Sequence, residues 1–139
     1  MTTSDQQRNV GLARRGMEAY NRGDIDEVLE LFSPEVEVYA PQEFMNAGVF
    51  HGREGWLKWI GQWNEAWGSF DIRVDRVEPL GERFVVLDAH QVGRGRGSGV
   101  SVEQDVTYLY EISDGRCVYF AVHPDRQSAL ADVHRREAG

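Results

Sequence analysis

The stretch from residue 70 to residue 123 alternates apolar and polar residues in four successive segments, which constrains the fold more than any other feature. A period of two is typical of strands that bury one face. The connections between the segments are short and carry turn residues, and strands connected in this way pair antiparallel. The sequence therefore predicts an antiparallel meander of four strands: FDIRVDRVE, RFVVLDAHQVG, GVSVEQDVTYLYEI and RCVYFAVH.

The first third of the chain has helical periodicity instead. A helix is predicted over about residues 5–21, with Ser4 as its N-cap and Gln7 at the capping-box position. A shorter helix follows, with Asp24 as its N-cap. Residues 35–40, EVEVYA, alternate and predict a short strand.

Tryptophans dominate a third predicted helix, in residues 53–67. Four tryptophans and Ile60 recur there at helical spacing, so one broad face of the helix is apolar. Such a stripe is usually core. Because four tryptophans exceed the needs of a small core, we expect part of the stripe to line a cavity.

The order of these elements defines the fold class. Helix, helix, strand, helix and four antiparallel strands predict an α+β fold with its helices on one side of the sheet. A length of 139 residues suits a single domain over residues 1–139. After Pro124 we expect a short helix that frays into a charged tail over about residues 127–139.

Charge and composition exclude several classes of function. The net charge of −8 argues against nucleic-acid binding, which needs a basic surface. No apolar run approaches the roughly 20 residues that span a bilayer, and the N-terminus lacks the features of a signal peptide. We therefore expect a cytoplasmic protein with neither a membrane nor a nucleic acid as partner.

The sequence offers no motif for metal binding, phosphate binding or covalent catalysis. The four histidines lack the spacing of a metal site, and the single cysteine, Cys117, reads as a small core residue. The stretch VGRGRGSGV lacks the glycine spacing of a phosphate-binding loop and reads as a turn, with Arg94 and Arg96 in solvent. We therefore expect no metal and no cofactor.

Four stretches, taken in order, resemble the SnoaL-like polyketide cyclase branch of the nuclear transport factor 2-like superfamily: AYNRGDIDEVLELFSPEVEVYAP, FHGREGWLKWI, VGRGRGSGV and YEISDGRCVYFAVHPDRQSAL. The resemblance implies a strongly bent sheet wrapped around the N-terminal helices, forming a cone with an internal pocket. It also implies homodimers through the outer sheet face. Because the superfamily includes isomerases, dehydratases, hydrolases, cyclases and proteins without catalysis, the fold does not choose among these activities.

Asp88 and His90 are the candidate catalytic residues. They share one face of their strand, but both faces are partly apolar, so the pattern does not say which face points inward. The resemblance implies an inward position for both, because the epoxide-hydrolase branch places two polar pocket residues there. Other residues of that branch map onto Val38, Ala40 and Val122, so its mechanism is not expected here.

Ala40 and Gly16 likewise stand where the ketosteroid-isomerase branch needs a base and a tyrosine. The cyclases, by contrast, use an aspartate and a histidine. We expect Asp88 and His90 to exchange protons with a substrate, and Tyr108 or Tyr110 to hold a developing oxyanion.

The expected partner is a small apolar molecule, bound by side chains at inward positions of the helices and strands. These predicted substrate-binding residues are Met17, Tyr20, Trp56, Trp59, Trp63, Tyr108, Tyr110, Phe120 and Val122. Three functions remain open at this point: an acid–base enzyme without a cofactor, a non-catalytic ligand-binding protein, and a dimeric interaction module.

Overall fold

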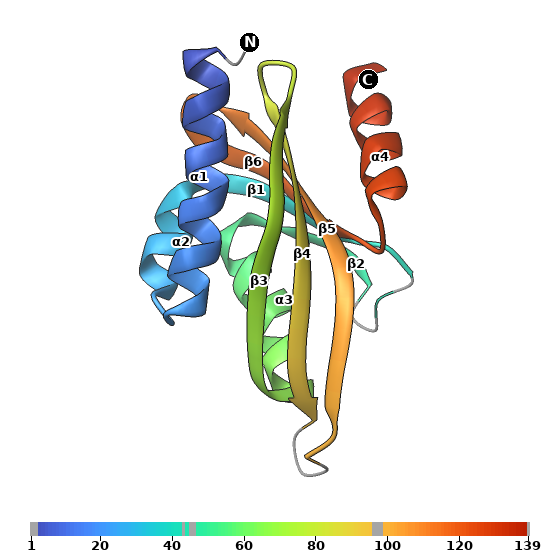
Figure 1. Cartoon of the computed structure of the whole chain (residues 1–139). Helices are drawn as coiled ribbons and strands as arrows, with labels where there is room; N and C mark the ends of the chain where they lie inside the picture. Colours follow the sequence, from blue (N-terminus) through green and yellow to red (C-terminus); the bar gives the residue numbers. More distant parts are fainter. Residues whose placement is uncertain (1–2, 43, 45–46, 96–98, 139) are drawn as a thin grey trace.

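The computed structural model shows a curved, unclosed sheet with helices on both of its faces (Figure 1). It describes residues 3–42, 44, 47–95 and 99–138. The helices found there are α1 (Ser4–Asn21), α2 (Ile25–Leu31), α3 (Gly52–Ala66) and α4 (Arg126–Ala138). The strands are β1 (Phe32–Ala40), β2 (Gly48–His51), β3 (Trp67–Leu80), β4 (Phe84–Gly95), β5 (Ser101–Ser113) and β6 (Arg116–His123).

The predicted meander is confirmed, since β3, β4, β5 and β6 pair antiparallel in chain order. The full strand order is β2-β1-β6-β5-β4-β3. Two features differ from the prediction. Strand β1 pairs parallel with β6, so the sheet is mixed, and the connection after β1 contributes the edge strand β2, which the sequence did not indicate.

Turns with left-handed backbone connect the meander. Gly81 has φ 62° in the turn between β3 and β4, and Asp114 and Gly115 have φ 52° and 77° between β5 and β6. Glycine adopts this region without steric cost and Asp tolerates it, which explains why the turn residues were recognisable. Residues 96–98 of the glycine–arginine stretch, and with them the expected position of Arg96, lie outside the described residues, whereas Arg94 is exposed as expected.

Helix α1 begins one residue earlier than predicted, because Thr3 rather than Ser4 is its N-cap. The Thr3 side chain accepts a hydrogen bond from the Gln6 amide, and the Gln6 side chain accepts one from the Thr3 amide. At the other end, Asn21 bonds both the amide and the carbonyl of Ile72. These bonds tie the helix to β3 and so place one side of the pocket.

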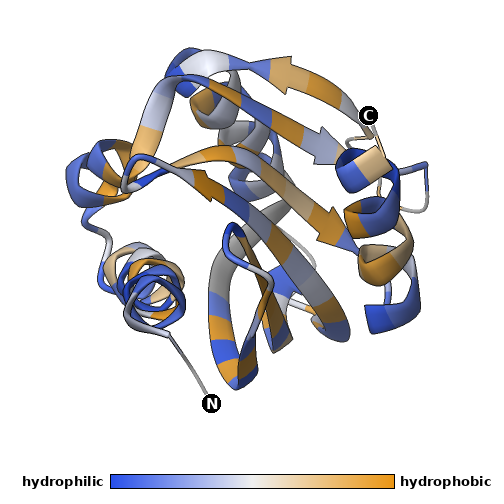
Figure 2. Cartoon of the chain, turned by 90° about the horizontal axis from the view of Figure 1, so that it is seen from above, coloured by the Kyte–Doolittle hydropathy of each residue, from blue (hydrophilic) through white to orange (hydrophobic). Residues whose placement is uncertain are grey.

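Two separate apolar clusters lie on the two faces of the sheet. The larger one joins the inner face to α1, α2 and α3. The smaller one, on the outer face, joins Phe84, Val86, Leu109 and Tyr119 to Val133 of α4. Figure 2 shows hydrophobic and hydrophilic residues alternating along the strands, as this two-sided arrangement requires.

The short helix expected after Pro124 is confirmed, but it does not fray into a charged tail from about residue 127. Residues 126–138 form the continuous helix α4, whose Ala129 and Val133 are buried against the outer face of the sheet. Asp132 anchors the same helix face, because its carboxylate accepts hydrogen bonds from Tyr119 (2.7 Å) and His123 (2.9 Å) of β6. None of the helices in the described ranges is long and apolar enough to cross a membrane.

Candidate functional site

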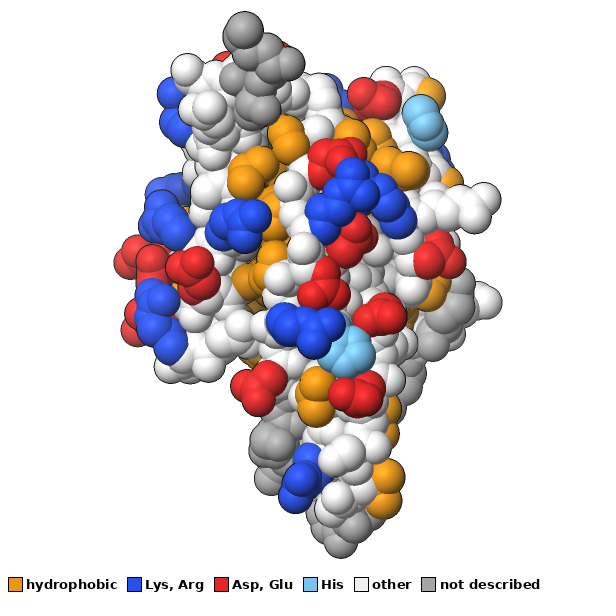
Figure 3. All heavy atoms as spheres, viewed as in Figure 1, with side chains coloured by type: hydrophobic (Ala, Val, Ile, Leu, Met, Phe, Trp, Pro, Cys, Tyr) orange, Lys and Arg blue, Asp and Glu red, His pale blue; other side chains and the backbone are white. Residues whose placement is uncertain are grey.

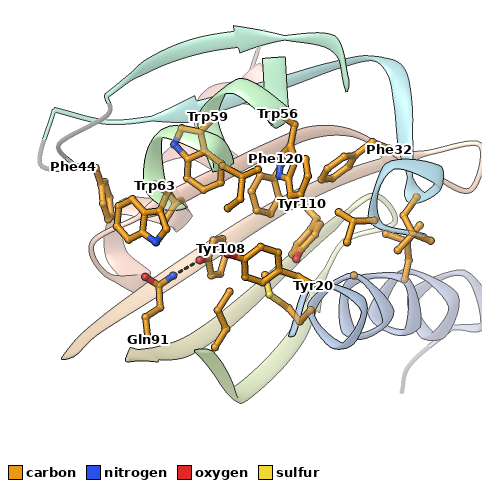
Figure 4. A pocket seen from close by; sticks show the side chains of 18 residues that line it. Tyr20, Phe32, Phe44, Trp56, Trp59, Trp63, Gln91, Tyr108, Tyr110 and Phe120 are labelled. Atoms are coloured by element: carbon orange, nitrogen blue, oxygen red, sulfur yellow. Dashed lines mark hydrogen bonds between the residues drawn. The ribbon is translucent and has the colours of Figure 1, made fainter. Parts of the chain in front are cut away.

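A pocket lies between the inner face of the sheet and the helices α1, α2 and α3 (Figure 4). All nine residues predicted to bind substrate line it: Met17, Tyr20, Trp56, Trp59, Trp63, Tyr108, Tyr110, Phe120 and Val122. Helical and strand periodicity bring them together, since each sits at an inward position of its own element. Their role toward a ligand remains a prediction.

The pocket is narrow. Its cavity volume is about 40 Å³. Roughly 10–15 Å³ of such space holds one water molecule. A ligand larger than a few waters must therefore displace side chains.

Aromatic rings form most of the pocket wall. Trp59 and Trp63 of α3 stack with centroids 6.4 Å apart, and Phe120 of β6 meets Trp59 edge-on at 6.1 Å. Phe120 also stacks on Tyr108 at 5.4 Å and meets Tyr110 at 5.1 Å. Such walls offer flat, polarisable surfaces that suit another ring.

One hydrogen-bonded pair interrupts this apolar lining. Gln91 of β4 donates from its side-chain nitrogen to the hydroxyl of Tyr108 on β5, and both side chains are buried. Burial raises the pKa of Tyr108, and that of Tyr110, well above the ordinary value near 10. Both phenols are therefore protonated at neutral pH and can act as hydrogen-bond donors.

Tyr20 is the third tyrosine of the pocket and lies on α1. Its hydroxyl donates to Asn64 Oδ1 of α3 at 3.3 Å, which links the two helices that flank the pocket. Burial, with a smaller contribution from the charge of Asp71, raises the pKa of Tyr20 to about 12. No described lining residue carries a carboxylate or an imidazole.

The expected inward orientation of Asp88 and His90 is wrong. Cross-strand partners share a face of a sheet, and the register pairs Asp88 with Thr107 and His90 with Asp105. Those partners lie on the face opposite to Tyr108 and Tyr110. The structure therefore places Asp88 and His90 on the outer face, away from the pocket.

Each of the two residues has partners on that outer face. Thr107 donates to Asp88 at 2.9 Å, and Arg126 at the start of α4 lies 3.2 Å from the same carboxylate. His90 bonds Asp105 at 2.7 Å and Glu103 at 3.3 Å, and the bond to Asp105, aided by the one to Glu103, raises the pKa of His90. These contacts make the pair part of a surface charge network.

Figure 3 views this outer face and shows positive and negative side chains intermixed over β3, β4 and β5. Arg73 pairs with Asp75 at 2.9 Å, and Arg76 with Glu78 at 2.5 Å. Exposed pairs of this kind stabilise a protein only slightly, because water screens them. These alternating charges belong to a solvated sheet surface.

The comparisons with known proteins agree with this fold and pocket. The family model described as "SnoaL-like domain" matches residues 13–120, which is most of the chain. The chain belongs to the SnoaL-like domain family.

Among curated proteins, uncharacterized proteins of Mycobacterium bovis and Mycobacterium tuberculosis are 36% identical over 53 residues. The match covers 38% of this SnoaL-like chain and 40% of the length of each mycobacterial relative.

Two solved structures resemble this SnoaL-like chain over most of its length. Bal32a, from a soil-derived mobile gene cassette, has a TM-score of 0.80 at 23% identity and covers 93% of this chain and 98% of its own. A putative SnoaL-like polyketide cyclase from Jannaschia sp. CCS1 has a TM-score of 0.79 at 17% identity and covers 94% of both chains. At these identities the likeness shows the shared fold.

Several lining residues of this SnoaL-like pocket were not predicted. Gln91 is the most informative, because the inward assignment of Asp88 and His90 placed it on the outer face. The antiparallel pairing of β4 with β5 carries the signal that would have found it, since Gln91 faces Gln104, on the same side as Tyr108. Phe44, from the connection between β1 and β2, also reaches the pocket, but nothing in its local pattern indicates this.

The remaining sequence predictions concern metal ligands and isolated residues. Within the ranges that the structure describes, His, Cys, Asp and Glu side chains form no group of three that could hold a metal ion. Cys117 is buried, as expected of a core residue. His123 ends β6, and its partner is Asp132 of α4 rather than any residue of the SnoaL-like pocket.

Proposed function

We propose that this SnoaL-like protein binds a small, flat, apolar molecule in the pocket between α3 and the inner face of the sheet. The observation that carries the proposal is the wall of stacked and edge-on rings around Phe120 that lines the pocket. Ligand pockets are typically concave, mostly apolar, and supplied with a few polar groups that set orientation. The polyketide-cyclase description of the Jannaschia relative fits a ring-bearing ligand.

Binding is better supported than acid–base turnover. General acid–base catalysis needs a titratable group within hydrogen-bond reach of the reacting atom. The described lining offers only tyrosines, and burial raises the pKa of Tyr108 and Tyr110 far from neutrality. Catalysis by Asp88 and His90 would need a substrate on the outer face instead.

A substitution on α1 tests the binding proposal. Gly16 lines the pocket, and a Cβ built there would meet only Leu31 Cδ1 at an ordinary contact distance of 3.7 Å. The variant Gly16→Leu should therefore fold, gaining about 1 kcal/mol of helix propensity, and project its side chain into the pocket. We expect it to weaken naphthalene binding by at least about ten-fold, measured by isothermal titration calorimetry.

Gly11 provides the matched control on the same helix. A Cβ built there meets nothing within 4 Å, and Gly11 does not line the pocket, so Gly11→Leu should bind naphthalene like the native protein. The outer-face variants Asp88→Asn and His90→Ala should do the same. If Gly16→Leu and Gly11→Leu bind naphthalene equally well, the ligand does not occupy this pocket.

The homodimer and the cytoplasmic location stay predictions. Helix α4 covers the part of the outer face that carries Phe84 and Val86. The surface left for a second copy is therefore the charged part of β3–β5, which includes the exposed Val92. Size-exclusion chromatography with light scattering would test the dimer.

A further inference from the structure

Gln91 and Tyr108 form a hydrogen-bonded pair in a pocket that is lined mostly by apolar and aromatic side chains. They come from adjacent strands, β4 and β5, and each is 3% exposed. Figure 4 shows both side chains at the pocket, joined by their hydrogen bond. Their remaining hydrogen-bonding capacity decides which ligands the pocket accepts.

The side-chain carbonyl of Gln91 is buried without a partner. Its Oε1 atom accepts no hydrogen bond from any residue that the structure describes. Most buried polar atoms in folded proteins are hydrogen-bonded, and an exception calls for an explanation. Gln91 lines the pocket, but less than 1 Å² of this atom is exposed, so a ligand donor can supply the missing bond only by moving neighbouring side chains.

The hydroxyl of Tyr108 can donate a hydrogen bond to a ligand. A phenol offers one donor and accepts through its lone pairs, and here it accepts from Gln91 Nε2. Its own proton thus remains available to an acceptor in the pocket. Burial keeps that proton in place by raising the pKa of the phenol.

The unpaired acceptor, Gln91 Oε1, and the available donor, the Tyr108 hydroxyl, lie on neighbouring groups. One ligand can therefore form hydrogen bonds with both. We propose that Gln91 Oε1 and the Tyr108 hydroxyl together select flat ring molecules that carry an N–H or O–H donor beside a carbonyl, as in lactams and cyclic hydroxy-ketones. The ligand donor bonds Gln91, and the ligand carbonyl accepts from Tyr108. This selectivity rests on the proposed function, because it requires that ring molecules enter the pocket.

Three probes of similar shape separate the two polar contacts. 2-Quinolone offers N–H and carbonyl, N-methyl-2-quinolone offers only the carbonyl, and naphthalene offers neither. Because a buried carbonyl left unpaired opposes binding, 2-quinolone should bind at least about ten-fold more tightly than either of the others in calorimetric titrations. In the variant Gln91→Leu, the affinity for 2-quinolone should exceed that for N-methyl-2-quinolone by about two-fold or less.

Tyr108→Phe removes the second contact and should weaken both quinolones relative to naphthalene. Thr107→Val is the control, since Thr107 neighbours Tyr108 in sequence but bonds Asp88 on the outer face. Thr107→Val should leave the ratios of the binding affinities for the three probes unchanged. Thermal melts establish that each variant is folded before titration.

The outcomes separate this inference from the proposed function. If all three probes bind equally well, the polar selectivity is wrong while the apolar pocket stands. If N-methyl-2-quinolone equals 2-quinolone and both exceed naphthalene, the contact to Gln91 is wrong. If none of the probes binds, both the selectivity and the proposed function are overturned.

Discussion

The variant Phe120→Ala is expected to lower the free energy of unfolding by about 3–5 kcal/mol. Phe120 is 4% exposed and touches the rings of Phe32, Trp59, Tyr108 and Tyr110 at centroid distances of 5.1–6.1 Å. Removing this ring loses its contacts with all four neighbours and leaves a cavity that they cannot fill without moving. Urea unfolding followed by circular dichroism measures the change.

Two further variants serve as controls for the stability loss of Phe120→Ala. Val92→Ala, at an exposed position of β4, should change stability by less than about 0.5 kcal/mol. Phe120→Leu refills part of the space and should cost less than Phe120→Ala. A loss below about 1 kcal/mol for Phe120→Ala would contradict the central packing role of this ring.

The variant Asp132→Ala is expected to lower the free energy of unfolding by a similar amount, about 3–5 kcal/mol, because it removes a buried charged partner. Asp132 is 1% exposed, and its carboxylate accepts hydrogen bonds from Tyr119, His123 and Arg135. Removing the carboxylate leaves buried donors of Tyr119 and His123 unpaired and releases α4 from β6. Chemical unfolding at pH 7 measures the loss, and Glu137→Gln, at the exposed end of α4, is the control.

Asp132 also predicts a dependence of stability on pH. Burial alone would raise the pKa of this carboxyl, but the hydrogen bonds from His123 and Tyr119, with the charge of His123 and the bond from Arg135, lower it below 3.8. A carboxyl whose pKa is lowered in the folded state stabilises the protein at every pH above the ordinary pKa of the unfolded chain. This stabilisation is lost as the pH falls through the pKa of the folded state. Stability should thus fall below about pH 4.

The isosteric variant Asp132→Asn isolates this contribution. It keeps the shape of the side chain but cannot titrate, so its stability should fall less steeply than that of the native protein between pH 5 and pH 2. Unfolding midpoints measured across this range would show the difference. Equal slopes for the two proteins would assign the acid sensitivity to other carboxylates.

The elements that the sequence predicted are those with strong local patterns. Alternation located the four strands of the meander, and helical spacing located α3 with its tryptophans. Helical spacing and strand alternation predicted nine of the 18 described residues that line the pocket. These predictions are confirmed because each depends only on the geometry of one helix or strand and on the burial of its apolar face.

The helix α4 shows where local pattern is insufficient. Its sequence is rich in charge, and only Ala129, Leu130 and Val133 mark an apolar face. Isolated helices of this length are marginal in water, and packing against a sheet stabilises them. A short helix that frays into a charged tail was therefore a reasonable prediction from the segment alone, and it concealed the second apolar cluster on the outer face.

That hidden cluster also explains why the strand pattern left the orientation of Asp88 and His90 open, so that the resemblance to the epoxide-hydrolase branch decided it, wrongly. Because α4 buries Phe84 and Val86 on the outer face, both faces of β4 are apolar over its first residues, and alternation cannot distinguish them. A shift by one residue exchanges every side chain between the two faces. The register with β5 decides between the alternatives, and it is a property of two strands rather than of one.

The sequence by itself carried the family resemblance, and it determined the order of the elements apart from β2 and part of the aromatic lining of the pocket. The element order and the predicted lining follow from periodicities and turn residues that a single segment carries. Only the tertiary structure decided that Gln91 rather than Asp88 and His90 faces the pocket, and that α4 covers the opposite face. The physical reason is that strand register and helix docking depend on long-range contacts, which no local pattern encodes.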